Sequence, residues 1–102
     1  LRKGEVRQQG LVDVDESVHK LVWTIAAWDD FTYWQGQGKK TLSDKSLIKD
    51  ALREPFDGIG KPEPLKENLS GFWSRRIDDT HRLVYCVEGE CLVVIAYRYH
   101  YQ

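Results

Sequence analysis

The sequence has no long hydrophobic run, and it has no hydrophobic segment near its beginning. No apolar stretch approaches the roughly 18 residues that a membrane-spanning helix needs, so we expect no membrane span. Residues 1–4 lead into a polar stretch, where a secretory signal would have its apolar core. These two absences predict a cytoplasmic protein.

An excess of positive charge is also missing. The chain has 15 Lys and Arg against 16 Asp and Glu, which gives a formal net charge of −1. Strong attraction to nucleic acid through net charge alone is therefore excluded. Any contact with RNA must depend on how the charges are distributed over the surface.

Cysteine is scarce as well, with Cys86 and Cys91 as the two examples. Their spacing differs from that of a C-x-x-C redox or zinc motif. We expect two small buried thiols, although a hairpin could place them opposite each other. Acids and histidines do not form a plausible ligand set, so no metal and no cofactor are expected.

What the sequence does contain suits one domain. Its 102 residues are 41% hydrophobic, which is enough for a single core. Residues 1–18 are polar and lack a hydrophobic period, and we interpret them as a flexible N-terminal extension or tag. The domain itself is predicted to span residues 19–102.

Hydrophobic periodicity predicts a strand and two helices in the first half of the domain. The strand covers residues 19–23, and Thr24 is expected to cap a helix over residues 25–35. The apolar side of this helix consists of Ile25, Trp28, Phe31 and Trp34. The apolar side of a second helix, over residues 40–53, consists of Leu47, Ile48, Ala51 and Leu52.

The second half is predicted to be a loop followed by three strands. Residues 55–64 hold all three prolines and form the loop. The strands cover residues 72–78, 82–88 and 91–99, with turns at 78–80 and 88–90. The predicted fold class is α+β, with two N-terminal helices packed on one face of a mainly antiparallel sheet.

Strand alternation predicts which side chains share a face of this sheet. If both turns use three residues, one face carries Arg76, Arg82, Arg98 and His100. The helices then cover the other face, which carries Val93, Ile95, Tyr97 and Tyr99. A two-residue turn at either place would break this grouping.

The loop and the strands also carry a set of side chains with a shared chemical use. Glu63 lies between Pro62 and Pro64, which fix the backbone and reduce the entropy of positioning a carboxylate. The charged residues that accompany it are Lys66, Arg75, Arg76, His81, Arg82, Arg98 and His100. A carboxylate, several cations and a histidine suit cleavage of a phosphodiester by its own 2′-hydroxyl. That reaction needs a base, an acid and positive charge around the phosphorus.

At these residues the sequence resembles the YoeB/Txe toxins of the RelE superfamily, over roughly residues 20–101. The resemblance is carried by Trp23, Ala27-Trp28-Asp29-Asp30, Tyr33-Trp34, Pro55-Phe56, Gly58, GKPEPLKENLSGFWSRRI at 60–77, HRLVY at 81–85 and RYHY at 98–101. It implies a RelE-like microbial RNase fold and the toxin of a type II toxin–antitoxin module. Such a toxin enters the ribosomal A site and cleaves mRNA. The implied partners are mRNA and rRNA at the 30S A site, a YefM-like antitoxin and a second toxin copy.

Matching positions also imply roles for individual residues. Glu63 resembles the general base and His100 the general acid, while Arg82 resembles the residue that stabilises the transition-state phosphate. Lys66 and Arg76 resemble supporting phosphate contacts, and Tyr101 resembles the tyrosine that orients the substrate. Because Tyr101 alternates with His100, it can serve the site only if the terminus leaves strand geometry.

Arg75 and His81, which adjoin Arg76 and Arg82 in the sequence, are given different roles. Arg75 points away from Arg76 in a strand, so it is expected to meet antitoxin, rRNA or solvent. His81, beside Arg82, is an alternative to His100 as the acid. An alternative function is a non-catalytic RelE/ParE-like toxin that binds and poisons a protein target such as gyrase. The joint presence of Glu63, Arg82 and His100 favours the nuclease.

Overall fold

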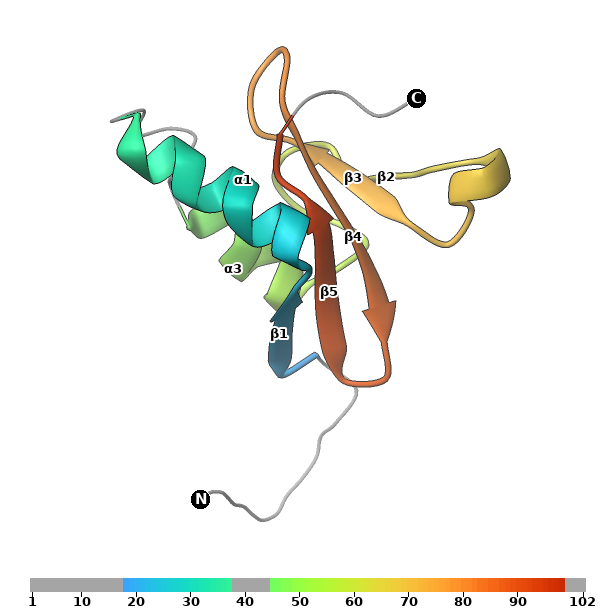
Figure 1. Cartoon of the computed structure of the whole chain (residues 1–102). Helices are drawn as coiled ribbons and strands as arrows, with labels where there is room; N and C mark the ends of the chain where they lie inside the picture. Colours follow the sequence, from blue (N-terminus) through green and yellow to red (C-terminus); the bar gives the residue numbers. More distant parts are fainter. Residues whose placement is uncertain (1–17, 38–44, 99–102) are drawn as a thin grey trace, which may run out of the picture.

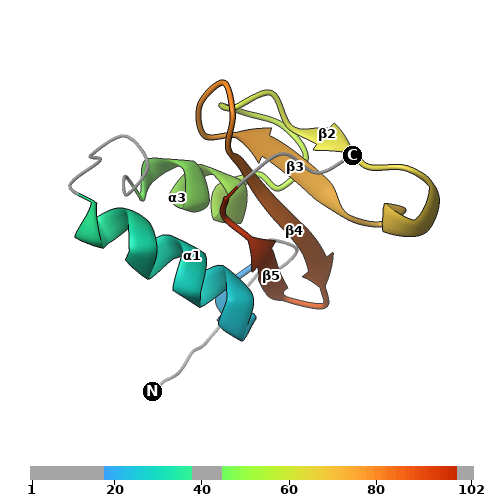
Figure 2. The same cartoon turned by 45° about the horizontal axis from the view of Figure 1, so that its top comes forward.

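The described part of the protein forms two layers, a pair of helices and a five-stranded sheet. The computed structural model describes residues 18–37 and 45–98. The helices are α1 (Ile25–Gly36) and α3 (Ser46–Arg53). The strands are β1 (Lys20–Trp23), β2 (Glu63–Pro64), β3 (Trp73–Arg76), β4 (Arg82–Glu88) and β5 (Cys91–Ala96), with a 3-10 turn, η2 (Glu67–Leu69), before β3. Both helices lie on one face of the sheet (Figures 1 and 2), which confirms the predicted α+β arrangement.

The sheet has the strand order β1-β5-β4-β3-β2. Strands β2 to β5 pair in antiparallel fashion, and β1 pairs with β5 in parallel. The sheet is therefore mainly antiparallel, as predicted. The short strand β2 lies inside the segment predicted as a loop. Two residues flanked by prolines show no periodicity, and an edge strand tolerates Pro64 because its missing N–H is not needed there.

Helix α1 begins as predicted, but it buries a different side. The Thr24 hydroxyl accepts a hydrogen bond from the Ala27 N–H at 3.2 Å, which caps the first turn. The buried residues of the helix are Ala27, Phe31 and Trp34. Ile25 and Trp28, which were predicted to lie on the apolar side, are 83% and 50% exposed, so that side does not coincide with the buried one. The helix is rotated so that Ala27 faces the sheet, and Trp28 packs edge-on against Trp23 at the rim.

Helix α3 packs as its pattern predicts. Leu47, Ile48 and Ala51 are buried, and Leu52 is partly buried against the same core. Residues 40–44 of the predicted helix lie outside the described residues. Val18, the first described residue, also belongs to the core.

The turn between β3 and β4 has the predicted length, whereas the turn between β4 and β5 is shorter. Arg76 pairs with Arg82, and the Ile77 N–H donates to the His81 carbonyl at 2.9 Å, so residues 78–80 form the first turn. Glu88 pairs with Cys91, so the second turn has two residues, not the three assumed. Consequently Leu92 and Val94 face the helices, and the prediction for Val93 and Ile95 was wrong.

A β-bulge then restores the predicted alternation. Tyr85 pairs with Val94 and Val84 pairs with Ala96, so Ile95 is an extra residue on β5. Beyond the bulge, Tyr97 is buried in the core below the helices. Ala96 is therefore aligned with Val84 on the face turned away from the helices, called the open face below. Both residues are buried, whereas Glu63 and Arg76 of this face are exposed.

Candidate active site

Glu63 projects from the edge strand β2 onto the open face. It pairs with Ser74 of β3, and Ser74 pairs in turn with Val84 of β4. Directly paired residues in antiparallel strands point to the same side of the sheet. Glu63 is exposed. The carboxylate is thus held by a strand ladder and remains accessible to a ligand.

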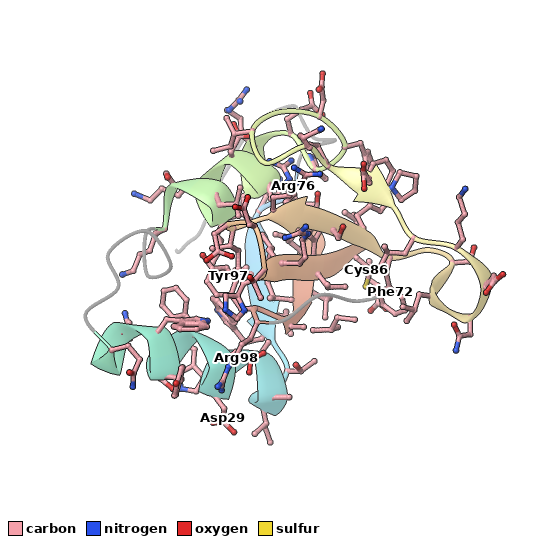
Figure 3. All side chains as sticks on the ribbon, turned by 90° about the horizontal axis from the view of Figure 1, so that it is seen from above. Asp29, Phe72, Arg76, Cys86, Tyr97 and Arg98 are labelled. Carbon is pink, nitrogen blue, oxygen red and sulfur yellow. The ribbon has the colours of Figure 1, made fainter. Side chains whose placement is uncertain are left out.

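Arg76 and Arg82 occupy the next row of the same face. They are direct cross-strand partners, two residues beyond the Ser74–Val84 pair. Figure 3 shows Arg76 beside the loop that joins α3 to β2. Diagonal neighbours in a sheet are roughly 7–8 Å apart, which is within reach of long side chains. Strand alternation therefore grouped Arg76 and Arg82 correctly, whereas Glu63, which was predicted to lie in a loop, belongs to the edge strand of the same face.

Arg82 is held by the turn that precedes it. Its Nη1 donates to the carbonyls of Asp78 and His81 at 2.7 and 3.0 Å, and the residue is 8% exposed. The Asp78 carboxylate fixes this turn by accepting the N–H groups of Thr80 and His81. Burial raises the pKa of Asp78, but these hydrogen bonds and the nearby cations outweigh burial and place its pKa below the ordinary value. The guanidinium is therefore anchored before any ligand arrives.

The prediction that Arg98 shares the open face with Arg76 and Arg82 was wrong. Its guanidinium carbon lies 3.8 Å from the centre of the Tyr33 ring and 5.4 Å from that of Trp34. Figure 3 shows Arg98 beside α1. Both rings belong to α1. Because β5 ends at Ala96, the side chain of Arg98 does not follow the alternation of the strand. It forms a cation–π contact with the helix.

The end of β5 is anchored to α1 at two backbone positions. The Tyr97 N–H donates to Asp30 at 3.0 Å, and the Trp34 indole donates to the Tyr97 carbonyl at 3.0 Å. These contacts set the point from which the chain continues. His100 and Tyr101, the predicted acid and the predicted orienting residue, lie outside the described residues.

The other candidate positions differ in their surroundings. Lys66 is exposed just before η2, beyond the end of β2. His81 packs against Trp34 with a ring-centre distance of 4.6 Å, so it faces α1 and not the face of Glu63. A cavity of about 210 Å³ adjoins Arg76 and is lined by Ser46, Leu47, Ile59, Gly60, Ile77 and Tyr97. It is smaller than the roughly 300 Å³ of typical ligand pockets.

The prediction for Arg75 was wrong. This residue is completely buried, on the helix side of β3, and therefore meets neither solvent nor a partner. Alternation predicted its direction correctly, but the loop that closes over it cannot be inferred from alternation. Asp50, which accepts from Arg75 at 2.7 Å, was not predicted to contribute. Its position on the polar side of α3 gave no signal for that contact.

The described residues contain neither a candidate metal site nor a disulfide. No group of His, Cys, Asp and Glu within them could hold a metal ion. Cys86 and Cys91 are both free, and burial raises the pKa of the Cys86 thiol. Among residues 18–37 and 45–98, neither helix is long and apolar enough to cross a membrane.

Comparison with known proteins decides the family. A sequence model described as the YoeB-like toxin of bacterial type II toxin–antitoxin systems matches residues 23–101. The chain belongs to the YoeB-like toxin family. It is 57% identical over 83 residues to Toxin YoeB of Escherichia coli K12, covering 80% of this chain and 99% of that protein. It is 51% identical over 83 residues to Toxin YoeB of Streptomyces coelicolor, with the same coverage of both chains.

Solved structures of YoeB-like toxins have the same fold. A YoeB/ParE toxin from Agrobacterium tumefaciens superposes with a TM-score of 0.76 at 49% identity, covering 81% of this chain and 100% of that one. The YoeB dimer from Staphylococcus aureus superposes with a TM-score of 0.72 at 40% identity, covering 80% of this chain and 97% of that one. The same toxin is also seen in a heterotetrameric YoeB–YefM complex.

Proposed function

We propose that this YoeB-like toxin is a ribosome-dependent endoribonuclease that cleaves mRNA in the A site and thereby inhibits translation. The observation that carries the proposal is the strand register, which sets Glu63, Arg76 and Arg82 on one side of the sheet, where Glu63 and Arg76 are exposed. A carboxylate beside two arginines offers a base for a hydroxyl and positive charge for a phosphate.

In the proposed reaction Glu63 takes the proton of a ribose 2′-hydroxyl. The 2′-oxygen attacks the adjacent phosphorus, and the bond from phosphorus to the 5′-oxygen breaks. His100 gives its proton to that departing oxygen. The products are a 2′,3′-cyclic phosphate and a free 5′-hydroxyl, and neither a metal nor a cofactor takes part.

The cations have separate tasks in this scheme. Arg82 stabilises the charge that develops on the phosphorane, because its guanidinium is always charged and is already anchored at the turn. Arg76 and Lys66 hold the flanking phosphates, and Tyr101 orients the substrate. A net charge of −1 gives little general attraction to RNA, so the ribosome supplies much of the positioning.

The proposed partners follow from the same family. The Staphylococcus aureus relative forms both a dimer and a complex with YefM. We therefore propose that a YefM-like antitoxin restrains this toxin, and that two copies of the toxin can associate. The site of action is the cytoplasm, where translating ribosomes are found.

Primer extension on translating ribosomes tests this function, with Arg82→Ala as the comparison. We expect the wild type to cut at A-site codons and Arg82→Ala to leave the mRNA intact. Intact mRNA with the wild type would exclude the nuclease. Growth arrest with DNA damage in place of mRNA cuts would instead support the non-catalytic poison of gyrase.

A further inference from the structure

Arg75 donates hydrogen bonds in several directions from a fully buried position. Its Nε binds the Tyr85 hydroxyl at 2.9 Å. Its two terminal nitrogens reach the Asp50 carboxylate and three backbone carbonyls, those of Glu54, Asp57 and Ile59. The guanidinium therefore joins β3 to helix α3 and to the loop that leaves it.

The loop over residues 54–60 is fitted closely around this guanidinium. The Asp50 carboxylate that Arg75 binds also accepts the Ile59 N–H at 3.0 Å. Gly58 has φ +123°, and a Cβ added there would lie 2.0 Å from the same Asp50 oxygen. The loop can follow this path because residue 58 has no side chain.

The loop that Arg75 holds, residues 54–60, leads directly to Glu63. The Gly60 carbonyl accepts the Arg76 N–H at 2.7 Å, and Glu63 pairs with Ser74. Only residues 61 and 62 separate these two anchors. Lys61 has φ +52°, a left-handed conformation that costs a non-glycine residue energy and persists only when its surroundings enforce it. The position of Glu63 thus depends on how firmly the preceding loop is held.

We propose that Arg75 is a positioning residue for Glu63: it clamps residues 54–60 so that the carboxylate stands beside Arg76 and Arg82. This inference rests on the proposed function, in which Glu63 is the general base. Arg75 lies on the helix side of the sheet and never touches RNA. The two adjacent arginines therefore have different roles: Arg76 contacts phosphate on the open face, and Arg75 holds the loop from the helix side.

A positioning role differs from a contribution to stability alone. Burying an arginine carries a desolvation cost that its ion pair offsets only in part, so such a group is a weak source of net stability. Every loop contact of Arg75 ends on a backbone carbonyl, which defines the conformation of the loop whatever its side chains are. Loss of the clamp should accordingly slow the chemical step more than it weakens substrate binding.

The test compares Arg75→Lys and Asp50→Asn with Leu92→Ala. Leu92 is buried on β5, where its strand partners are Leu21 of β1 and Val87 of β4, so Leu92→Ala controls for lost core stability. We expect Arg75→Lys to cut ribosome-bound mRNA at least 10-fold more slowly in single turnover. The half-saturating ribosome concentration should stay within 2-fold. Leu92→Ala should cut at the wild-type rate at a temperature where it is folded.

Amide hydrogen exchange supplies a readout that does not depend on activity. We expect the Ile59 and Arg76 amides to exchange at least 10-fold faster in Arg75→Lys. The Thr24 amide, bonded to Val94 O, should change no more than it does in Leu92→Ala. If Arg75→Lys does not fold, Asp50→Asn replaces it in both measurements. We expect Asp50→Asn to cut ribosome-bound mRNA at least 3-fold more slowly than the wild type.

Two results would overturn the inference. One is a wild-type cleavage rate in folded Arg75→Lys or Asp50→Asn, and the other is an equal slowing in Leu92→Ala. Failure of the proposed function looks different, because the wild type itself would then leave the mRNA intact. In that case Arg75 could not act in catalysis, even if the amide exchange rates show that it holds residues 54–60.

Discussion

Arg76 and Arg82 face each other directly across strands β3 and β4. Like charges at directly opposed positions destabilise a sheet, by roughly 0.2–1 kcal/mol for a pair. An anion bound between them would relieve that repulsion. The pairing is consistent with the proposed role of both arginines as phosphate contacts.

This pairing predicts opposite effects of Arg76→Ala on stability and on activity. Its free energy of unfolding should stay equal to that of the wild type or rise by up to about 1 kcal/mol, because the repulsion is removed. Cleavage of ribosome-bound mRNA should fall by roughly 10²-fold, the usual loss for one charge-stabilising donor. Urea unfolding and single-turnover cleavage measure the two quantities. A large loss of stability would show that Arg76 is structural.

Glu63→Gln should abolish most cleavage without affecting the fold. A positioned general base contributes about 10²–10⁴-fold, and the amide cannot accept the proton. Because Glu63 is exposed, the midpoint of thermal unfolding should hardly change. Glu67→Gln, four residues along and also exposed, is the matched control and should cut normally. Equal rates for the two variants would remove Glu63 from the site.

Tyr85→Phe tests the support beneath the loop. The Tyr85 hydroxyl accepts from Arg75 Nε and donates to the Pro55 carbonyl at 2.6 Å. Its removal leaves buried polar groups unsatisfied, so we expect a loss of about 1–3 kcal/mol in urea unfolding. Tyr33→Phe, at a residue that is 40% exposed, should cost less than about 0.5 kcal/mol. If Tyr85→Phe were as stable as the wild type, the Tyr85 hydroxyl would contribute little to the hydrogen bonds around Arg75.

Asp50 should make stability depend on pH in the acid range. Hydrogen bonds from Arg53, from Arg75 and from the Ile59 N–H lower the pKa of Asp50 from 3.8 to about 2. A carboxyl whose pKa is lower in the folded state stabilises the fold above its unfolded pKa, and this contribution is lost as the pH falls from about 4 towards 2. The contribution is on the order of 2 kcal/mol. Urea unfolding of the wild type should lose this amount relative to Asp50→Asn across that interval, and parallel curves would contradict the assignment.

The sequence allowed local features to be predicted better than features that depend on distant contacts. Thr24 as a cap and the apolar side of α3 follow from short-range patterns, and both are confirmed. The extra residue Ile95 was not predictable, because a bulge is decided by how β5 must meet both α1 and β4. Its presence compensates for the short turn at residues 89 and 90.

The candidate site shows the same division. Alternation places Arg76 and Arg82 together and sends Arg75 to the other face, and the structure agrees. What covers Arg75 depends on the path of residues 54–60, which is set by carbonyls and by Gly58 and leaves no hydrophobic pattern. Arg98 was misplaced because a strand was assumed to continue beyond Ala96.

The account depends most on attack by the ribose oxygen beside Glu63, and one substrate tests it directly. Ribosome-bound mRNA carrying a single 2′-deoxynucleotide immediately 5′ of the scissile phosphate is incubated with the wild-type toxin. We predict that it stays intact while an all-ribose control is cut to a 2′,3′-cyclic phosphate. Cleavage of the deoxy-substituted mRNA at the same bond would contradict the proposed mechanism.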